Sequence, residues 1–181
     1  MSRRIRLRQL PVLPLVLGVT DGILNALTLA AGAILRGTGD GLNIELAGRV
    51  GAASCVTAAF TMFVADYAER RTRLVRASRE LNLTEPGRLA ATSLGRTVAR
   101  ESTIAAGLAA IASLVGAAGP LLLGTLLPVP PLVALAITIL LLGVLGWLIG
   151  ATLTARKLRW AIVMLIGGIA VTVIGAWLDI A

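Results

Sequence analysis

Five apolar segments, each about 20 residues long, divide this chain of 181 residues. Since an α-helix rises 1.5 Å per residue, about 20 residues span the ~30 Å hydrocarbon core of a bilayer. Hydrophobic residues make up 57% of the chain, and its mean hydropathy of +0.90 exceeds what a domain with a wetted surface carries. The sequence therefore predicts an all-α integral membrane protein with one domain, 1–181, and five transmembrane helices at about 13–35, 46–66, 102–123, 132–153 and 160–178.

The first span follows an arginine-rich start that resembles a secretory signal. Its apolar run, Leu10 to Leu35, is longer than the apolar region of a signal peptide, and it lacks an obvious small-residue cleavage site. We therefore expect this run to be retained as the first membrane helix.

Basic residues lie mainly on one side of the predicted membrane. Four arginines precede the first span, eight lie in the segment 67–101, and three basic residues join the fourth span to the fifth, which places 15 of the 17 on the same side. By the positive-inside rule this side is cytoplasmic, so we expect the N-terminus in the cytoplasm and the C-terminus outside. Sixteen arginines against one lysine, with abundant Ala and Gly, suggest a GC-rich bacterial genome and hence the bacterial plasma membrane.

The segment 67–101 is too charged for hydrocarbon, since it holds eight arginines and four glutamates. Residues 69–81 have a helical pattern and should extend the second span into the cytoplasm. Pro86 disfavours helix at Glu85, so we predict a break at 82–87. The net charge of +8 does not indicate a nucleic-acid partner, because the arginines lie between apolar segments with few aromatic residues for base stacking.

Asp21 is the most informative polar residue because it falls inside the first span. A carboxylate in a membrane helix is costly unless it meets a partner, a cavity or an ion, so it indicates a function by default. Together with Asn25, Thr28 and Gly32 it follows the spacing of one helix face, which should point inward. The alternatives are that Asp21 caps a helix restarting at Gly22, or that it pairs with an arginine of the N-terminal cluster.

The second span carries a matching face of small or polar residues. Met62 and Asp66 lie one turn apart on this face. The first span enters from the cytoplasm and the second returns to it, so Asp21 and Met62 both lie roughly 10–12 Å from the cytoplasmic interface. We therefore expect a carboxylate oxygen and a thioether sulfur to meet at one depth. The members of the face are Gly51, Ser54, Cys55, Ala58, Thr61, Met62, Ala65 and Asp66.

This pair of donors suits a divalent metal ion. The chain has no histidine and one cysteine, so a metal would bind to carboxylate, carbonyl, hydroxyl or sulfur ligands. A mixed oxygen and sulfur site fits Fe²⁺ better than Mg²⁺ or Ca²⁺, and the lack of histidine is also compatible with Mn²⁺. Two structural alternatives stay open: Met62 fills a gap in the packing, and Asp66 forms an interfacial ion pair with Arg70.

We expect no enzymatic activity. Asp21-Gly22 resembles the opening of the signature of membrane alcohol phosphatidyltransferases, but the Ala-Arg pair and the two further spaced aspartates of that signature do not follow. Asp40-Gly41 is an ordinary turn signal. No permanently bound cofactor is expected.

Two motifs resemble those of the vacuolar iron transporter family, which consists of five-helix divalent-metal exporters. Residues 18–23 are similar to the first-helix motif, in which Asp-Gly follows a Gly and two variable residues, and Gly32 stands ten positions after the Asp-Gly. Residues 61–67, Thr-Met-Phe-Val-Ala-Asp-Tyr, are similar to the second-helix motif Ser-Met-x-x-Gly-Glu-Tyr and keep its spacing from Met to acid to Tyr. Weaker similarity continues at 114–121 and 168–175.

The resemblance implies a homodimer with a metal path between its subunits, and export from the cytosol driven by proton antiport. It assigns ion contact to Asp21 and Met62 and, with Asp in place of Glu, to Asp66. The segment after the second span is short and lacks the glutamate-rich helices with which full-length members collect metal. Glu69 and Glu80 are the only plausible remnants of such a region. Each also fits the role of a solvated partner for a neighbouring arginine.

Two functions are compatible with these features. The first is a homodimeric transporter that moves Fe²⁺ or Mn²⁺ out of the cytosol, with the lipid bilayer, the ion and protons as partners and Asn25 as a secondary site residue. The second is a non-transporting membrane packing or assembly protein that retains the fold. They differ in whether Asp21 faces a wet, shared cavity or is bound by arginine. Small residues fit contacts between subunits or within one chain, and they are Gly143, Gly146, Gly150, Gly168, Thr172 and Gly175.

Overall fold

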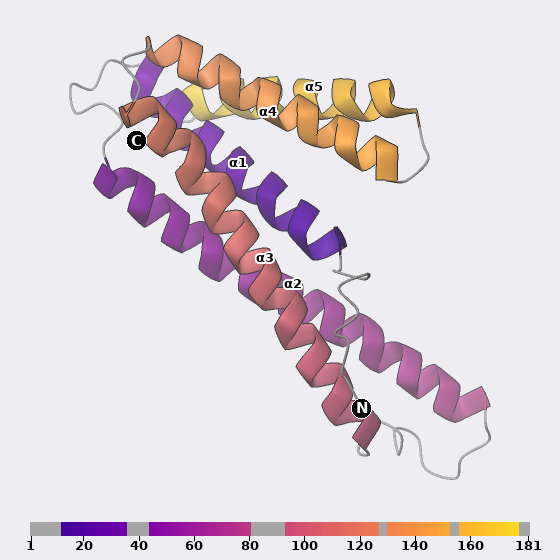
Figure 1. Ribbon diagram of the computed structural model, residues 1–181. Coiled ribbons are helices and arrows are strands. Elements are labelled where there is room, and N and C mark those ends of the chain that lie inside the picture. Colours follow the sequence, from indigo (N-terminus) through magenta and orange to yellow (C-terminus); the bar gives the residue numbers. More distant parts are fainter. Residues whose placement is uncertain (1–11, 36–43, 81–92, 127–129, 153–155, 178–181) are drawn as a thin grey trace, which may run out of the picture.

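The computed structural model describes residues 12–35, 44–80, 93–126, 130–152 and 156–177, and these form a bundle of α-helices. Successive helices run in opposite directions (Figure 1). Each is long and apolar enough to cross a membrane, so the predicted all-helical class with five candidate membrane helices is confirmed. The helices are α1 (Val12–Leu35), α2 (Ile44–Glu80), α3 (Ser93–Leu126), α4 (Pro131–Thr152) and α5 (Lys157–Trp177).

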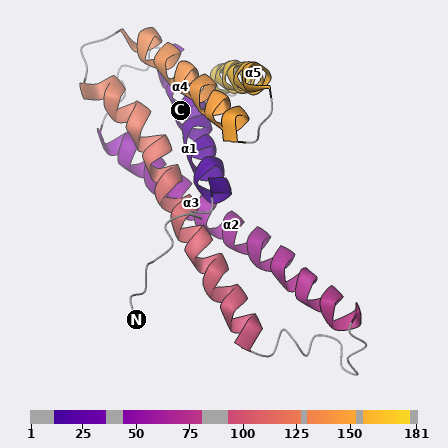
Figure 2. The same ribbon diagram turned by 45° about the vertical axis from the view of Figure 1, so that its right-hand side comes forward.

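Two helices, α2 and α3, are longer than a membrane span requires. They contain 37 and 34 residues, or roughly 55 and 51 Å of helix. Both extend beyond the first residue of α1 (Figures 1 and 2). α3 begins at Ser93, ahead of the span predicted from 102, and this extra part is joined to α2 by an ion pair between Arg70 and Glu101. The N-terminal arginine cluster, the Asp40-Gly41 turn and the break at 82–87 lie outside the described residues.

Glycines let α1 and α3 touch backbone to backbone. A Cβ atom at Gly22 would overlap the carbonyl oxygen of Ser113, and a Cβ atom at Gly18 would overlap a carbonyl oxygen one turn earlier on α3. From the opposite helix, a Cβ atom at Gly116 would lie 2.6 Å from a carbonyl oxygen of α1. These obstacles are backbone atoms, which cannot rotate away as side chains do. A larger residue at any of these positions would therefore push the two helices apart.

The core consists of aliphatic and small side chains around α1. Leu27 of α1, Leu121 of α3 and Leu142 of α4 are among its most deeply buried members. Many other buried positions are alanines, including Ala31 and Ala117. Small residues suit helix contacts in a membrane, where close packing and van der Waals contact drive association.

Several glycines of α4 and α5 pack against other helices of this one chain. A Cβ atom at Gly146 would lie 2.6 Å from the carbonyl oxygen of Trp160 on α5, and one at Gly143 would meet a leucine side chain of α5. A Cβ atom at Gly175 would overlap the carbonyl oxygen of Thr28 on α1. At these positions the structure therefore shows intramolecular contacts, one of the two alternatives that the sequence left open.

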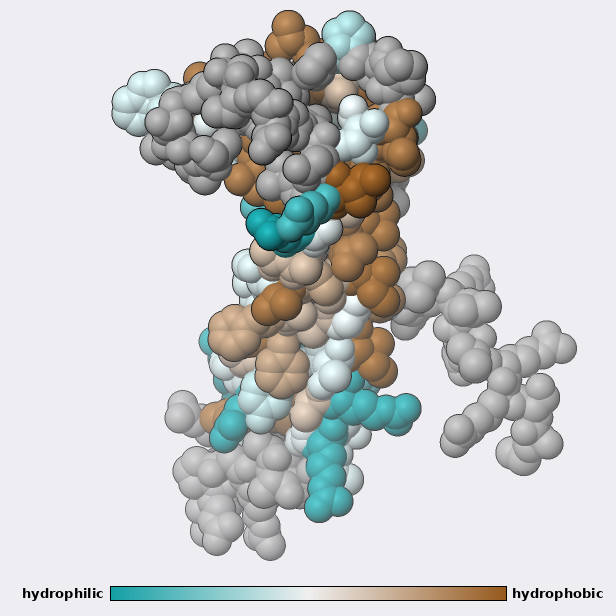
Figure 3. All heavy atoms as spheres, turned by 90° about the vertical axis from the view of Figure 1, so that its left-hand side faces the viewer, coloured by the Kyte–Doolittle hydropathy of each residue, from teal (hydrophilic) through white to brown (hydrophobic). Residues whose placement is uncertain are grey.

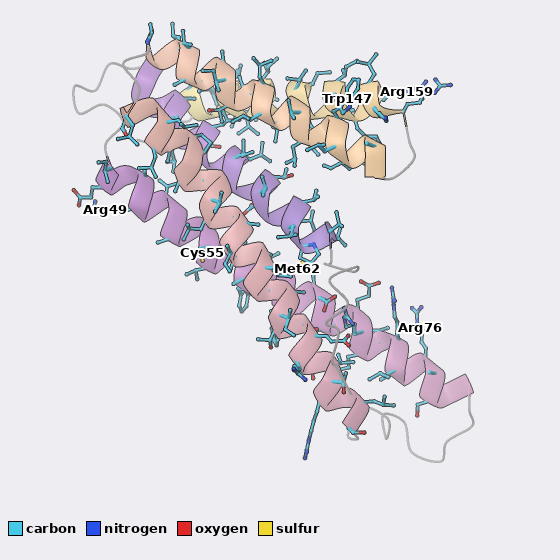
Figure 4. The ribbon with its side chains drawn as sticks, in the orientation of Figure 1. Arg49, Cys55, Met62, Arg76, Trp147 and Arg159 are labelled. Atoms are coloured by element: carbon cyan, nitrogen blue, oxygen red, sulfur yellow. The ribbon has the colours of Figure 1, made fainter. Side chains whose placement is uncertain are left out.

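The outward faces of the helices are apolar. In Figure 3, brown and pale side chains fill the middle of the visible face, and teal polar side chains lie above and below this band. Arg49 and Arg76 lie at opposite ends of α2 (Figure 4). Such a surface is consistent with an integral membrane protein, because lipid tails would cover the exposed apolar residues. Examples of these residues are Val56, Phe60, Trp147, Leu148 and Trp177.

We expect Gly22→Ala to lower the free energy of unfolding by about 1–3 kcal/mol, the usual cost of overpacking a tight contact. Gly107→Ala is the matched control, because Gly107 lies on α3 and a Cβ atom there would meet nothing within 4 Å. That control should be neutral or stabilising by up to about 1 kcal/mol, since Ala favours helix over Gly. Denaturant unfolding in detergent micelles measures both changes. Equal stability of the two variants would show that α1 and α3 do not pack tightly at Gly22.

Candidate functional site

Asp21 lies on α1 at the point where α1 touches α3. Its Oδ2 atom accepts a hydrogen bond from the Ser113 hydroxyl at 3.3 Å and a weak one from the Asn25 amide at 3.5 Å. Both donors are neutral. No ion pair reaches Asp21 from any residue that the structure describes. Among the described residues, the carboxylate is therefore held only by hydrogen bonds from neutral groups.

The hydrogen bonds of Asn25 and Ser113 also reach α2. Asn25 Nδ2 donates to Ser54 Oγ at 3.0 Å. The Ser113 hydroxyl has one proton to share between Asp21 Oδ2 and the backbone carbonyl oxygen of Ser54, which is 3.1 Å away. Ser54 and Ser113 are both buried. This network, formed by Asp21, Asn25, Ser54 and Ser113, ties α1, α2 and α3 together inside an apolar bundle. It also fixes the position of the Asp21 side chain.

Asp21 and Met62 line the same cavity. This space, the inner cavity, has a volume of about 240 Å³, lies between α1, α2 and α3, and is open on the side where Thr57, Thr61 and Ala65 are exposed. The sequence placed the two residues at one depth, and the structure brings them to one cavity. Its lining residues are Leu17, Gly18, Asp21, Thr57, Ala58, Thr61, Met62, Ala65 and Ala109.

A second space, the outer cavity, lies next to the charged ends of α2 and α3. Its volume is about 490 Å³, and Met62 lines it as well as the inner cavity. Figure 4 shows Met62 on α2 close to the N-terminal end of α1. Met62 therefore borders both cavities. The lining residues of the outer cavity are Leu13, Pro14, Met62, Asp66, Arg70, Glu101, Ile104 and Ala105.

Asp66 belongs to the outer cavity and is paired there with Arg70. Its Oδ2 atom accepts hydrogen bonds from Arg70 Nε at 2.8 Å and from Ser102 Oγ at 2.7 Å. Arg70 also donates to Glu101 on α3. The ion pair with Arg70 that the sequence left open as an alternative is thus present, and the structure does not bring Asp66 into the inner cavity with Asp21.

The two secondary glutamates lie away from these residues. Glu69 forms an exposed ion pair with Arg73, one turn along α2, and lines neither cavity. Glu80 is the last residue of α2, and its side chain lies outside the described residues. In the structure Glu69 is therefore a solvated partner of a neighbouring arginine.

Sequence reasoning missed the contribution of α3. Ser113, Ser102 and Glu101 all come from this helix, yet none was singled out as a site residue. Ser113 is 0% exposed and stands among alanines and glycines in an apolar span. The sequence did contain a signal for this contact: the Ser113 hydroxyl lies in an apolar span at about the depth of Asp21. Buried polar groups in a membrane need partners, so the two groups could have been expected to meet.

The groups around the inner cavity offer several kinds of donor. Asp21 supplies a carboxylate and Met62 a thioether, while Thr57 and Thr61 add hydroxyl groups. In the described part of the chain, no three side chains of the types His, Cys, Asp or Glu come together as a metal cluster. Carboxylate, hydroxyl and thioether groups are all ligand types that an ion of borderline softness accepts.

No protein-family model, no curated protein and no solved structure matches this chain.

We expect Ser113→Ala to destabilise the bundle by roughly 0.6–1.7 kcal/mol, the range measured for hydrogen bonds between membrane helices. The substitution removes the hydroxyl that contacts both Asp21 and the Ser54 carbonyl. Thr103→Ala on the same helix is the control, since Thr103 is exposed and donates only to a carbonyl of its own helix. Thermal unfolding in detergent should separate the two variants. An unchanged midpoint temperature of unfolding for Ser113→Ala would show that this network does not stabilise the bundle.

Proposed function

We propose that this chain is a membrane transporter that moves divalent cations, Fe²⁺ or Mn²⁺, out of the cytosol in exchange for protons. The observation that carries the proposal is the Asp21 carboxylate, which lies inside a membrane helix, borders a cavity and is held only by neutral donors among the described residues. A carboxylate in such a place favours a cation, because the low dielectric strengthens its attraction for positive charge.

The inner cavity supports a preference among cations. Asp21 offers oxygen, and Met62 offers a polarisable sulfur on the opposite helix. Sulfur ligands favour Fe²⁺ over harder ions, whereas Mg²⁺ and Ca²⁺ bind oxygen almost exclusively. Fe²⁺ is thus the first choice of cargo, and Mn²⁺ is the second.

The similarity of residues 18–23 and 61–67 to the vacuolar iron transporter family supports the same function. Membership in that family is part of the proposal, as a short, divergent member without glutamate-rich metal-collecting helices. The proposed arrangement places the N-terminus in the cytoplasm of a bacterium and the C-terminus outside. In this arrangement the charged ends of α2 and α3, with the outer cavity between them, face the cytosol.

The proposed transporter is a two-fold dimer. Thr57 and Thr61 line the inner cavity and are exposed on the outer side of α2. Polar groups that face lipid are unfavourable, whereas a second copy of α2 would enclose them in a shared path. Ala58, by contrast, is buried within the single chain, so it lies on the intramolecular side of α2.

One observation favours a second candidate, a non-transporting packing or assembly protein. The network of Asp21, Asn25, Ser54 and Ser113 joins three helices without any ion. In that function Asp21 would serve only as a hydrogen-bond acceptor. The amide oxygen of an asparagine at position 21 would then accept these hydrogen bonds nearly as well as the carboxylate does.

Replacing Asp21 with Asn separates the two candidates. The amide keeps the shape and one acceptor oxygen, but it neither neutralises a divalent cation nor carries a proton. We expect Asp21→Asn to fold and to reduce Mn²⁺ and Fe²⁺ transport in proteoliposomes to the level of protein-free vesicles. Glu45→Gln is the control, because Glu45 is an exposed carboxylate at the other end of α2 paired with Arg49. Normal transport by Asp21→Asn would favour the assembly protein.

Replacing Met62 with Leu tests the sulfur ligand. This swap conserves volume and should cost less than about 1.5 kcal/mol of stability. We expect a several-fold loss of Fe²⁺ transport and a smaller loss of Mn²⁺ transport, because the harder ion depends less on sulfur. Met164→Leu is the matched control, since Met164 packs against the core from α5 and lines neither cavity. An unchanged ratio of Fe²⁺ to Mn²⁺ transport would reduce Met62 to a packing residue.

A further inference from the structure

Arg70 occupies the outer cavity in a way that the proposed transport function does not explain. The outer cavity is bordered by the start of α1 and by the charged parts of α2 and α3, and it shares the lining residue Met62 with the inner cavity. In the proposed transporter, a cation that enters through the outer cavity would pass close to Arg70, which lines this cavity. A fixed positive charge on such a route would normally repel the cargo.

The guanidinium of Arg70 lies between two carboxylates on different helices. Its Nε atom donates to Asp66 on α2 at 2.8 Å, and its Nη1 atom donates to Glu101 on α3. The side chains of Arg70, Asp66 and Glu101 are 36%, 14% and 51% exposed, so water reaches the Glu101 side of the cluster more than the Asp66 side. Each carboxylate receives a single bond from the guanidinium. Neither bond is the paired, two-bond contact that makes an arginine difficult to displace.

We propose that Arg70 is a displaceable counter-ion: it fills the space between Asp66 and Glu101 that a divalent cation would take on its way to Met62 and Asp21. This inference rests on the proposed function and identifies a residue that sets how long the ion stays in the outer cavity. Arginine keeps its charge at any physiological pH, so it gives way by swinging aside and not by losing a proton.

The charges explain why such a residue is useful. Asp66 and Glu101 without Arg70 carry two negative charges, which would fully neutralise a divalent cation and hold it. With Arg70 present the cluster keeps one negative charge, which attracts the ion but lets it leave. A transport path requires binding that is favourable enough for entry and weak enough for exit.

A second arginine on the same helix provides a matched control. Arg73 forms an ion pair with Glu69 at the same spacing of four residues. The Arg73 and Glu69 side chains are 74% and 62% exposed, and neither residue lines a cavity. Removing Arg73 changes the net charge of the segment as much as removing Arg70 does. Any effect specific to Arg70 must therefore come from its place in the outer cavity.

The test compares Arg70→Gln with Arg73→Gln in the full chain reconstituted into liposomes, with Mn²⁺ as the probe. We expect Arg70→Gln to lower both KM and kcat for Mn²⁺ transport by roughly two- to fivefold, the range of a partly exposed ion pair. Electron paramagnetic resonance should also show more Mn²⁺ retained by Arg70→Gln than by the wild type. Arg73→Gln should match the wild type, and Arg70→Lys, which keeps the charge, should restore most of the turnover.

Glu101→Gln gives a second, opposite test that does not depend on the folding of Arg70→Gln. It removes one negative charge and leaves Arg70 paired with Asp66, so KM should rise. If the wild type transports Mn²⁺ but Arg70→Gln and Arg73→Gln behave alike, the role proposed for Arg70 is wrong and the proposed function still stands. A wild type without transport would overturn the proposed function. In that case equal Mn²⁺ retention by Arg70→Gln and the wild type would overturn the inference as well.

Discussion

The backbone contact between α1 and α3 at Gly18, Gly22 and Gly116 is the constraint on which the candidate site depends. Asp21 stands next to Gly22, so the same contact that closes the two helices brings the carboxylate to the Ser113 hydroxyl. A wider crossing would separate these groups and leave the carboxylate without its donors. Helix packing and site geometry are therefore set by the same few atoms.

The two aspartates of the site have opposite surroundings. Asp21 lies partly buried at the contact between α1 and α3 and is held by a hydroxyl and an amide, whereas Asp66 is near the charged end and is held by a guanidinium and a hydroxyl. Met62 lies between them because it borders both cavities. A path that crosses these groups would take an ion from a partly neutralised site to one whose negative charge has no partner among the described residues. This order favours movement toward Asp21.

The sequence predicted the parts of this arrangement that depend on one helix at a time. The lengths of the apolar segments predicted five helices. The helical rise per residue predicted a common depth for Asp21 and Met62, and in the structure these two residues line one cavity. Contacts between distant segments could not be derived in this way. Ser113 is 92 residues from Asp21, and only the glycine crossing decides that they meet. The start of α3 at Ser93 likewise depends on its packing against α2.

The central claim is that this chain carries divalent cations across a membrane, and a flux measurement on the wild-type protein tests it most directly. Purified protein would be reconstituted into liposomes that contain a metal-sensitive dye, and Mn²⁺ or Fe²⁺ would be added outside with a proton gradient imposed in either direction. If the chain exchanges divalent cations for protons, metal should enter faster than in protein-free liposomes, its entry should be faster when the vesicle interior is acidic, and protons should be released from the vesicles. Metal entry equal to that of protein-free liposomes under both gradients would contradict the central claim.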